Sequence, residues 1–288
     1  MIVHIKKIIK KAQKGNYAIG AFNTINLETT IGILRAAQKM KSPVIIQISP
    51  RTIEYAGLKT IMGIIEHVAL AEAKNIPIAI HLDHGKSFEI VKRCVDAGFS
   101  SVHLDASEFD FEKNMALTKK AIDYAHRRGA WAQGELGRLF GREGLIRVIL
   151  PKNPDEYMTD PAKAKEFVQK TGVDTLAVSI GTMHGHFTGQ EKIDFNRLTE
   201  IVKRVKNPLV LHGGSGVKTA EIRKAIKLGI RIINLDTDLR LAFTATLRQT
   251  LRKIDGSHDP RKILAPSIKA VEKIVEAKIK VLGSFNKI

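Results

Sequence analysis

The hydrophobic positions of the chain form short apolar runs that alternate with segments of helical periodicity. A short apolar run is typical of a strand buried on both faces, and apolar residues at every third or fourth position are typical of a helix packed on one face. Predicted strands span 18–23, 43–49, 76–83, 100–106, 131–137, 175–180, 208–211 and 230–235. Predicted helices span 27–40, 61–74, 87–97, 111–128, 161–171, 195–205, 219–228, 239–253 and 267–282.

Eight strand–helix units without a break in composition predict an α/β protein, a single closed (β/α)8 TIM barrel with a C-terminal helical extension. We expect one domain over residues 1–288, because such barrels are single domains of about 250 residues. An open, doubly wound sheet is the alternative, but it usually carries a glycine fingerprint after its first strand. Here the first strand ends in Phe22, Asn23 and Thr24, which favours the barrel.

Polar residues stand at the carboxyl ends of all the predicted strands, where barrel enzymes place their active sites. They are Asn23, Ser49, Asp83 with His84, Asp105 with Ser107, Glu135, His184, His212 with Ser215, and Asn234 with Asp236 and Thr237. Any one of them could be a helix cap or a hydrogen-bonded core residue. All of them together predict a functional site.

Three of these residues are histidines beside glycine: His84, His184 and His212. A lone histidine at a strand end is most often a hydrogen-bonded core residue, but three at corresponding points favour a metal site. Neutral imidazoles suit zinc or another borderline transition metal, and a catalytic zinc site keeps three protein ligands and an open position. We interpret His81 as a packing or supporting residue.

A glycine-rich turn, Gly213-Gly-Ser-Gly216, follows the seventh strand and precedes a helix. Backbone N–H groups at such a turn bind anions, and TIM barrels often bind phosphate after strands seven and eight. The sequence therefore predicts a phosphate site there, with Asn234, Asp236 and Thr237 beside it.

Two carboxylates are candidates for proton transfer. Asp83 adjoins a predicted metal ligand, and Glu143 lies in a long glycine-containing loop after the fifth strand that could act as a lid. From the pattern alone, an ordinary solvated carboxylate is an equal interpretation of Glu143. A Schiff-base lysine is disfavoured, because none of the predicted strands carries an interior lysine.

Composition limits the partners and the compartment. The net charge of +18 suits anionic partners, but the lysines are scattered and no basic block is interleaved with aromatic residues, so we expect no nucleic acid partner. No apolar stretch is long enough for a membrane span. The lone cysteine, Cys94, fits a reducing cytoplasm.

The chain resembles, over essentially its whole length, the class II (metal-dependent) fructose-bisphosphate aldolase family, in the branch that includes tagatose-bisphosphate aldolase. The motifs that carry the resemblance are Gly20-Ala-Phe-Asn23, Pro43-Val-Ile-Ile-Gln-Ile-Ser49, His81-Leu-Asp-His-Gly85, Gly134-Glu-Leu-Gly-Arg138, Thr159-Asp-Pro161, Gly172-Val-Asp174, Gly181-Thr-Met-His-Gly185, His212-Gly-Gly-Ser-Gly216, Asn234-Leu-Asp-Thr237 and Asp259-Pro-Arg261.

The resemblance implies a role for each matched residue. His84, His184 and His212 would bind zinc, and Asp105 and Glu135 match positions for a second or alternative divalent metal. Asp83 would move the proton at the hydroxyl of the cleaved bond, and Glu143 the proton at the ketose-phosphate carbon. The dihydroxyacetone-phosphate end would be held by Gly185, Gly213, Ser215, Asp236 and Thr237, with a monovalent cation nearby.

Substrate contacts from Asn23, Ser49 and Asn234 are also implied. Arg261 would reach the site of a neighbouring subunit, which implies a homodimer or homotetramer. The sequence departs from the family pattern at His103, His186 and Thr188, and these departures bear on substrate choice.

The implied reaction is the reversible cleavage of a ketose 1,6-bisphosphate into dihydroxyacetone phosphate and glyceraldehyde 3-phosphate through a zinc-stabilised enediolate, in glycolysis and gluconeogenesis. Fructose 1,6-bisphosphate is the favoured substrate and tagatose 1,6-bisphosphate the nearest alternative. Two other functions stay open from the residues: a basic anion- or nucleic-acid-binding barrel, and a zinc hydrolase or isomerase.

Overall fold

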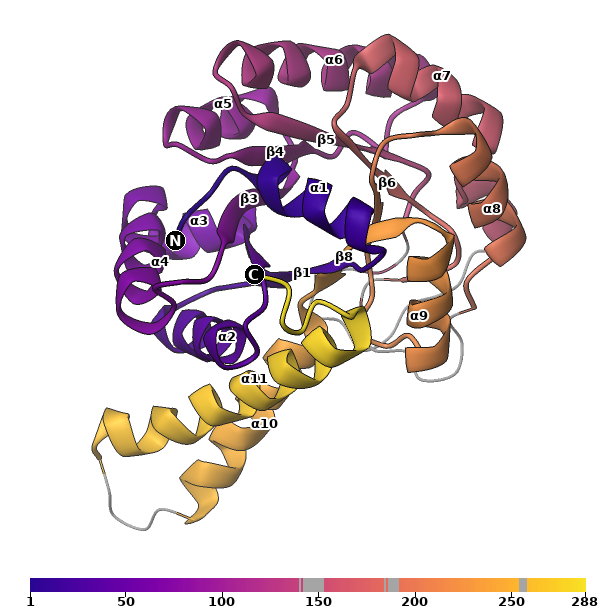
Figure 1. Ribbon diagram of the computed structural model, residues 1–288. Coiled ribbons are helices and arrows are strands. Elements are labelled where there is room, and N and C mark those ends of the chain that lie inside the picture. Colours follow the sequence, from indigo (N-terminus) through magenta and orange to yellow (C-terminus); the bar gives the residue numbers. More distant parts are fainter. Residues whose placement is uncertain (140, 142–152, 184, 186–191, 254–257) are drawn as a thin grey trace.

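The strands form a closed barrel. The computed structural model describes residues 1–139, 141, 153–183, 185, 192–253 and 258–288. Within them, parallel strands pair in chain order from β1 to β8, and β8 pairs with β1 (Figure 1). The strands are β1 (Ile19–Asn23), β2 (Val44–Ile48), β3 (Ile78–Gly85), β4 (Ser101–Leu104), β5 (Trp131–Leu136), β6 (Thr175–Val178), β7 (Leu209–Leu211) and β8 (Ile230–Leu235). The predicted (β/α)8 barrel is confirmed.

Helices surround the barrel and extend beyond it. They are α1 (Ile5–Gly15), α2 (Leu27–Lys39), α3 (Pro50–Ala56), α4 (Leu58–Glu72), α5 (Phe88–Asp96), α6 (Phe111–Arg127), α7 (Pro161–Thr171), α8 (Phe195–Arg204), α9 (Thr219–Leu228), α10 (Thr237–Lys253) and α11 (Pro260–Leu282), with a 3-10 turn, η1 (Pro154–Tyr157). Two of them, α1 and α3, have no counterpart among the predicted helices. A left-handed Gly57 at φ +80° separates α3 from α4.

The last helix starts earlier than the sequence predicts. Asp259 accepts a hydrogen bond from the backbone N–H of Arg261, and Pro260 occupies the first turn, where a missing N–H costs little. The helix then continues through Pro266, directly before the predicted start at residue 267. Packing of α11 against α2 and α10 outweighs the local preference of that proline.

The side chains that face the barrel interior fall into an apolar set and a polar set. The apolar set is Ile19, Ala21, Ile45, Ala79, Ala177, Val210 and Ile232. On β1, β2, β3, β7 and β8 the inward side chains nearer the carboxyl end are polar, whereas on β6 Thr175 precedes Ala177. The polar set is buried and its members are hydrogen-bonded to one another: Asn23, Gln47, His81, Asp83, Ser101, Gln133, Thr175, His212 and Asn234. We call the apolar set the lower layer and the polar set the upper layer.

Helix α1 covers the amino-terminal end of the barrel (Figure 1). Its buried residues Ile5, Ile8, Ile9 and Ala12 repeat at helical spacing, and they pack against the lower layer. His4 caps the helix by accepting a hydrogen bond from the backbone N–H of Lys6. This closure leaves the upper layer to form the functional end.

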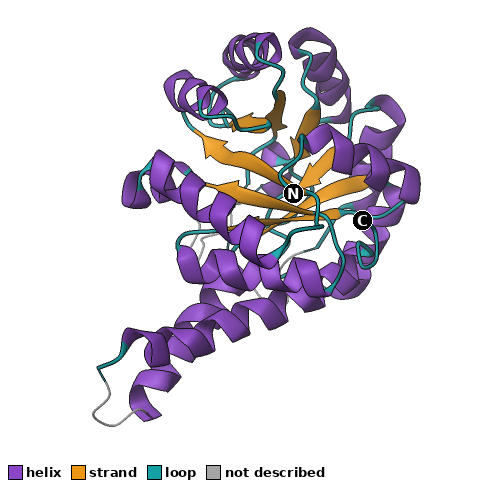
Figure 2. Ribbon diagram, turned by 60° about the vertical axis from the view of Figure 1, so that its left-hand side comes forward, coloured by secondary structure: helices purple, strands orange, loops and turns teal. Residues whose placement is uncertain are grey.

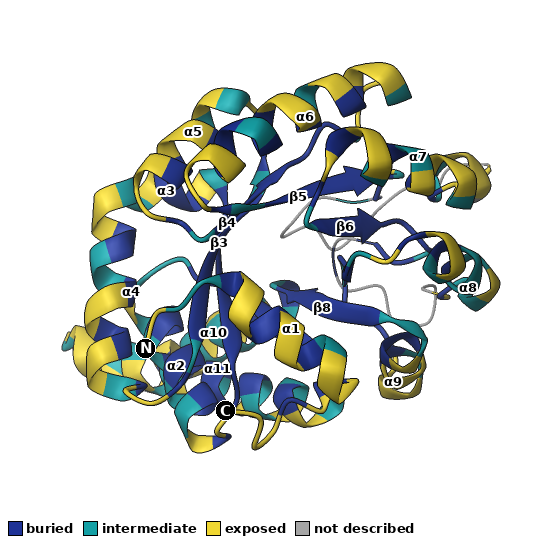
Figure 3. Ribbon diagram, turned by 45° about the horizontal axis from the view of Figure 1, so that its top comes forward, coloured by how far each residue is buried: buried dark blue, intermediate teal, exposed yellow. Residues whose placement is uncertain are grey.

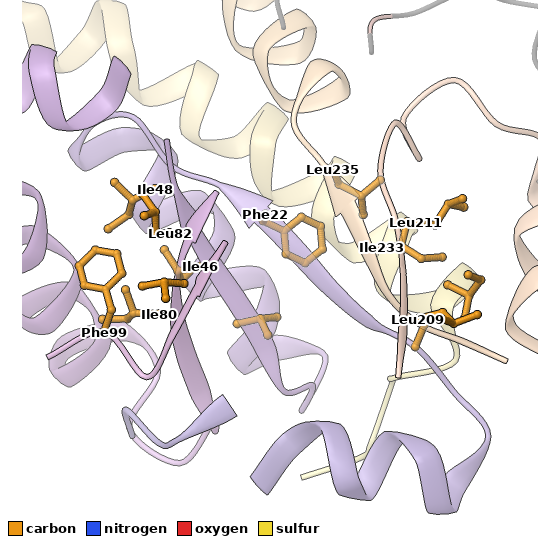
Figure 4. Close-up of a cluster of buried hydrophobic side chains, with 14 of the residues drawn as sticks. Phe22, Ile46, Ile48, Ile80, Leu82, Phe99, Leu209, Leu211, Ile233 and Leu235 are labelled. Atoms are coloured by element: carbon orange, nitrogen blue, oxygen red, sulfur yellow. The ribbon is translucent and has the colours of Figure 1, made fainter. Parts of the chain in front are cut away.

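The main hydrophobic core lies between the strands and the surrounding helices. Outward-facing side chains of the strands, among them Phe22, Ile46, Leu82 and Ile233, form this cluster with the inner faces of the helices (Figure 4). The strands are buried except for the half-buried His84 and Trp131, and exposed residues lie on the outer faces of the helices (Figure 3). This core fixes the strands that carry the upper layer.

Helices α10 and α11 form an arm. They pack against each other, and their ends near residues 253 and 258 project away from the barrel (Figure 2). Along α10 only Thr237, Leu239 and Thr250 are buried. No helix in the described part of the chain is sufficiently long and apolar to cross a membrane.

Candidate active site

Asp83, at the end of β3, accepts hydrogen bonds from three side-chain amides of the upper layer. Its carboxylate receives N–H groups from Asn23 at 2.8 Å, Gln47 at 3.4 Å and Asn234 at 3.2 Å. The residue is only 2% exposed, and burial raises the pKa of its carboxyl group above the usual range, against the opposing effect of His84. A buried carboxyl group that is held in one orientation and has a raised pKa is suited to general acid–base catalysis.

His84 and His212 face each other across the barrel. Nε2 of His84 lies 2.9 Å from Nδ1 of His212, so two imidazole nitrogens are directed at one place. On the far sides of the rings, Nδ1 of His84 lies 2.8 Å from Oδ2 of Asp105, and the Gln133 amide lies 3.1 Å from Nε2 of His212. Carboxylate and amide partners of this kind orient histidines that bind metals.

Asp105 is held by several donors. Its Oδ2 accepts from Lys86 Nζ at 2.6 Å, and its Oδ1 accepts from the hydroxyl and backbone N–H of Ser107 at 2.7 and 3.2 Å. Although burial opposes it, the bond to His84 lowers the pKa of Asp105 well below its usual range. Asp105, Asp83 and Glu135 in turn raise the pKa of His84 to about 10, again against burial.

Glu135, at the end of β5, brings a carboxylate oxygen to the same histidines. Its Oε2 lies 3.6 Å from Nδ1 of His212, 3.8 Å from Nδ1 of His84 and 3.6 Å from Nε2 of His103. That oxygen is buried and has no hydrogen-bond partner among the described residues. Burial, followed by repulsion from Asp105, raises the pKa of Glu135 to about 8.

This donor set fits a divalent transition metal. Two overlapping groups of ligand-type residues have their ligand atoms within 4.8 Å of one another: Asp83, His84, His103 and His212, and His84, His103, Asp105 and Glu135. Converging imidazole nitrogens and an unpaired, buried carboxylate oxygen are the donors that zinc prefers in proteins.

A small pocket lies beside these histidines. Asp83 and His84 line it together with residues that the sequence analysis expected at the phosphate and substrate site: Asn23, Gly185, Gly213, Ser215, Asn234, Asp236 and Thr237. Gly213 has φ +67°, and a Cβ there would lie 2.1 Å from the carbonyl oxygen of Met183. Only glycine allows these two loops to approach so closely.

A larger cavity of about 490 Å³ adjoins the pocket, and His84 lines both. Three cationic side chains line the cavity, Arg51, Lys86 and Arg138, together with Ser49 and Ser107. Ser49 also caps α3 by accepting from the backbone N–H of Thr52. The carboxylates of Asp105, Glu108 and Glu135 line the larger cavity as well, so both spaces are polar.

Other predicted site residues lie elsewhere or outside the described residues. Arg261 is in the first turn of α11, where its side chain is 90% exposed and paired with Asp259 rather than directed into either cavity. Glu143 and His184 lie outside the described residues, as do the departures His186 and Thr188.

Two residues of the site escaped the sequence analysis, Gln47 and Gln133. Each is an uncharged polar residue inside a strand, and each faces the barrel interior next to a predicted functional residue. The signal that could have found them is a hydrogen-bonding side chain two residues before a predicted functional residue, Ser49 for Gln47 and Glu135 for Gln133. His81, interpreted from the sequence as a packing or supporting residue, lies 2.8 Å from the Ser101 hydroxyl, and burial lowers its pKa to about 3.

The fold and these residues together define a TIM-barrel enzyme whose candidate metal centre and polar pocket lie at the carboxyl end of the strands. The family model for class-II fructose-bisphosphate aldolase matches residues 3–287. The chain belongs to the class-II fructose-bisphosphate aldolase family, and it is a carbon–carbon lyase of that class.

Relatives of known name support the assignment. The fructose-bisphosphate aldolase of Thermus caldophilus is 42% identical over 310 aligned positions and covers 100% of both chains. That of Geobacillus stearothermophilus is 40% identical over 289 positions, covering 99% of this chain and 98% of the relative. Among solved structures, the YdjI aldolase from Escherichia coli K12 superposes with a TM-score of 0.85 at 33% identity, covering 99% of this chain and 98% of its own.

Proposed function

We propose that the chain cleaves fructose 1,6-bisphosphate reversibly into dihydroxyacetone phosphate and glyceraldehyde 3-phosphate, with a divalent metal held by His84, His212 and His184. The observation that carries this proposal is the junction of the two cavities at His84, opposite His212. When bound, zinc would supply a Lewis acid that polarises the substrate ketone. Glu135 and Asp105 are proposed to support the centre, with Glu135 as an alternative ligand.

The chain's own residues would orient the substrate. One phosphate would occupy the small pocket, where Ser215 and the amino-terminal end of α10 at Thr237 offer donors to an anion. The other phosphate would lie in the larger cavity, near Arg51, Lys86 and Arg138. A fixed position for each end aligns the bond to be cleaved with Asp83, and such orientation lowers a barrier by several kcal/mol.

Asp83 would exchange the proton of the hydroxyl at the cleaved bond. Its raised pKa allows it to hold that proton, and the three amides fix the direction of its carboxyl group. We assign the second proton transfer, at the ketose-phosphate carbon, to Glu143. The proposed monovalent cation would lie near Gly185, Gly213 and Ser215.

The arm supports the proposal of a homodimer or homotetramer. The described part of α10 is largely unburied within one chain, and Arg261 lies on the arm rather than at its own chain's site. A second copy packed on the arm would let Arg261 enter its neighbour's cavity. We place the reaction in the cytoplasm, where the buried thiol of Cys94 would stay reduced.

The first test is triose-phosphate release from fructose 1,6-bisphosphate and tagatose 1,6-bisphosphate, measured with and without a chelator. We expect chelator-sensitive cleavage with the fructose sugar faster, and the ratio of kcat/KM identifies the substrate. Chelator-resistant cleavage would remove the histidines from the mechanism. Cleavage of neither sugar by metal-loaded protein would reject the aldolase proposal in favour of another metal-dependent reaction on this barrel.

A further inference from the structure

His103 is the buried residue that the proposed mechanism leaves without a role. It lies on β4, with 0% of its surface exposed, and its ring centroid is 5.0 Å from that of His84 and 5.4 Å from that of His212. An imidazole among three ligand-type residues in an apolar barrel needs a specific reason, because polar groups are costly to bury. Its contacts supply one.

The pairing of β3 with β4 is irregular at the metal site. Leu82 pairs with Val102 and Gly85 pairs with Leu104, so two residues of β3, Asp83 and His84, lie opposite the single residue His103. This is the geometry of a β-bulge, in which one strand carries an extra residue that the ladder does not pair. The bulge therefore falls on the proposed proton-transfer residue and the first proposed ligand.

The His103 side chain takes the place of the missing ladder bond. The backbone N–H of His84 donates to Nδ1 of His103 at 3.3 Å. His84 has φ +48°, a left-handed conformation that a residue with a Cβ rarely adopts, so its backbone depends on surrounding contacts. The bond from His103 satisfies a buried donor and holds this conformation.

The same bond fixes the hydrogen on the other ring nitrogen. Since Nδ1 accepts, the neutral ring carries its hydrogen at Nε2. That N–H faces Oε2 of Glu135 across 3.6 Å, and neither atom has a hydrogen-bond partner in the part of the chain that the structure describes. His103 is therefore oriented as a donor toward Glu135 and not as a metal ligand.

We propose that His103 is a positioning residue of the metal centre: its ring bridges the bulge in β3 and aligns the backbone of His84 with the carboxylate of Glu135. This inference rests on the proposed metal-dependent function, because it assigns His103 a role through two of the proposed ligands.

Metal binding to the metal-free protein tests the proposal without any substrate. Cobalt(II) is the probe, since its visible absorption reports the arrangement of its ligands, and its affinity is measured by calorimetry. His103→Leu removes both contacts of the ring. His103→Asn keeps an acceptor near the Nδ1 position, and His103→Gln keeps a donor near the Nε2 position.

We expect His103→Leu to weaken cobalt binding by about 10- to 100-fold, the usual effect of losing an orienting group, and to change the visible spectrum. His103→Asn should recover most of the affinity, because the backbone of His84 regains its acceptor, and His103→Gln should recover less. His126→Leu is the control: it removes an imidazole at the end of α6 that pairs with Asp174 and lines neither cavity, and its spectrum should equal that of the unaltered protein.

Wild-type affinity and spectrum in His103→Leu would overturn the proposal. Loss of a whole equivalent of bound metal in all three His103 variants would overturn it too, because it would make His103 a direct ligand. If His103→Leu does not fold, the cobalt affinities of His103→Asn and His103→Gln are compared with each other. Equal affinities of these two variants would contradict the proposed role of Nδ1 as the acceptor for the backbone of His84. An unaltered protein that binds no cobalt would reject the proposed metal-dependent function as well.

Discussion

At the scale of single residues, the network around Asp83 explains how a buried carboxyl group can serve as a proton carrier. Three amides hold its orientation, while burial keeps its pKa high. We expect Asp83→Asn, which conserves shape, to fold normally and to lower kcat by about 10²- to 10⁴-fold, the usual contribution of a general acid or base. Steady-state kinetics with circular dichroism measure this, and unchanged kcat in a folded variant would remove Asp83 from the mechanism.

The same scale gives a pH dependence for the metal-free protein. The pKa of His84 is raised to about 10 and that of Glu135 to about 8, so the folded state holds protons that the unfolded state has released. The contribution of His84 is fully present below about pH 6.5 and is lost as the pH rises through about 10. Below about pH 6.5 the lowered pKa of His81 acts in the opposite direction, so we expect the unfolding free energy to fall from about pH 7 to about pH 10.

Urea unfolding of chelated protein across this pH range measures the decline. The Glu135→Gln variant should show a smaller decline in the unfolding free energy in the lower part of this pH range, because glutamine cannot titrate. Saturating zinc should flatten the upper part, since a bound metal replaces the proton on the imidazole. A metal-free unfolding free energy that rises over this range would contradict the assigned shifts.

The sequence predicted which functional residues stand at the strand ends, but it did not predict their hydrogen-bond partners or the register of the strands that carry them. Asp83, His84, Glu135 and His212 follow from the rule that barrel enzymes use the carboxyl ends of strands. The bulge opposite His103 could not be predicted, because a register shift depends on how two separate strands pair. Gln47 was missed for a similar reason: only the closed barrel brings its amide to a carboxylate on the neighbouring strand.

At the scale of elements, α1 shows how a short amphipathic helix can complete a barrel. Ile9 is fully buried against the lower layer, so Ile9→Ala should lower the unfolding free energy by about 2–5 kcal/mol through lost burial and a cavity. The neighbouring Lys10→Ala, on the exposed side of the helix, should change it by no more than about 0.5 kcal/mol. Equal effects of the two variants in urea unfolding would show that α1 does not stabilise the barrel.

Helices α7 and α9 have the bounds that the sequence predicts. Helix α7, predicted over 161–171, has those bounds in the structure, with Asp160 as its cap and the left-handed Gly172 at its end. Helix α11 begins before its predicted start, because its packing partners are distant in the sequence and cannot be inferred from a local proline.

At the scale of the whole molecule, the arm determines how copies of the chain would cooperate. If Arg261 binds the distal phosphate in a neighbouring site, Arg261→Ala should lower kcat/KM for the bisphosphate at least about tenfold, the effect of losing about 1.4 kcal/mol of binding. The molar mass of the Arg261→Ala variant, measured by light scattering, should equal that of the parent oligomer. The adjacent Lys262→Ala, equally exposed, is the control and should keep parent kinetics.

Kinetics of Arg261→Ala equal to those of Lys262→Ala would exclude Arg261 from substrate binding. A monomeric parent protein that cleaves the bisphosphate at full rate would exclude a shared site altogether.

The division of the barrel interior into a lower and an upper layer has a consequence for how this chain can vary. The lower layer serves only packing. Apolar substitutions among its isoleucines and alanines and the facing residues of α1 should therefore be tolerated without loss of catalysis, if the total side-chain volume is conserved. The upper layer carries groups that are costly to bury and were retained for what they do. Substitutions in the lower layer can therefore alter the stability of the protein to heat. Substitutions in the upper layer can alter its substrate preference, and the two kinds of change are independent.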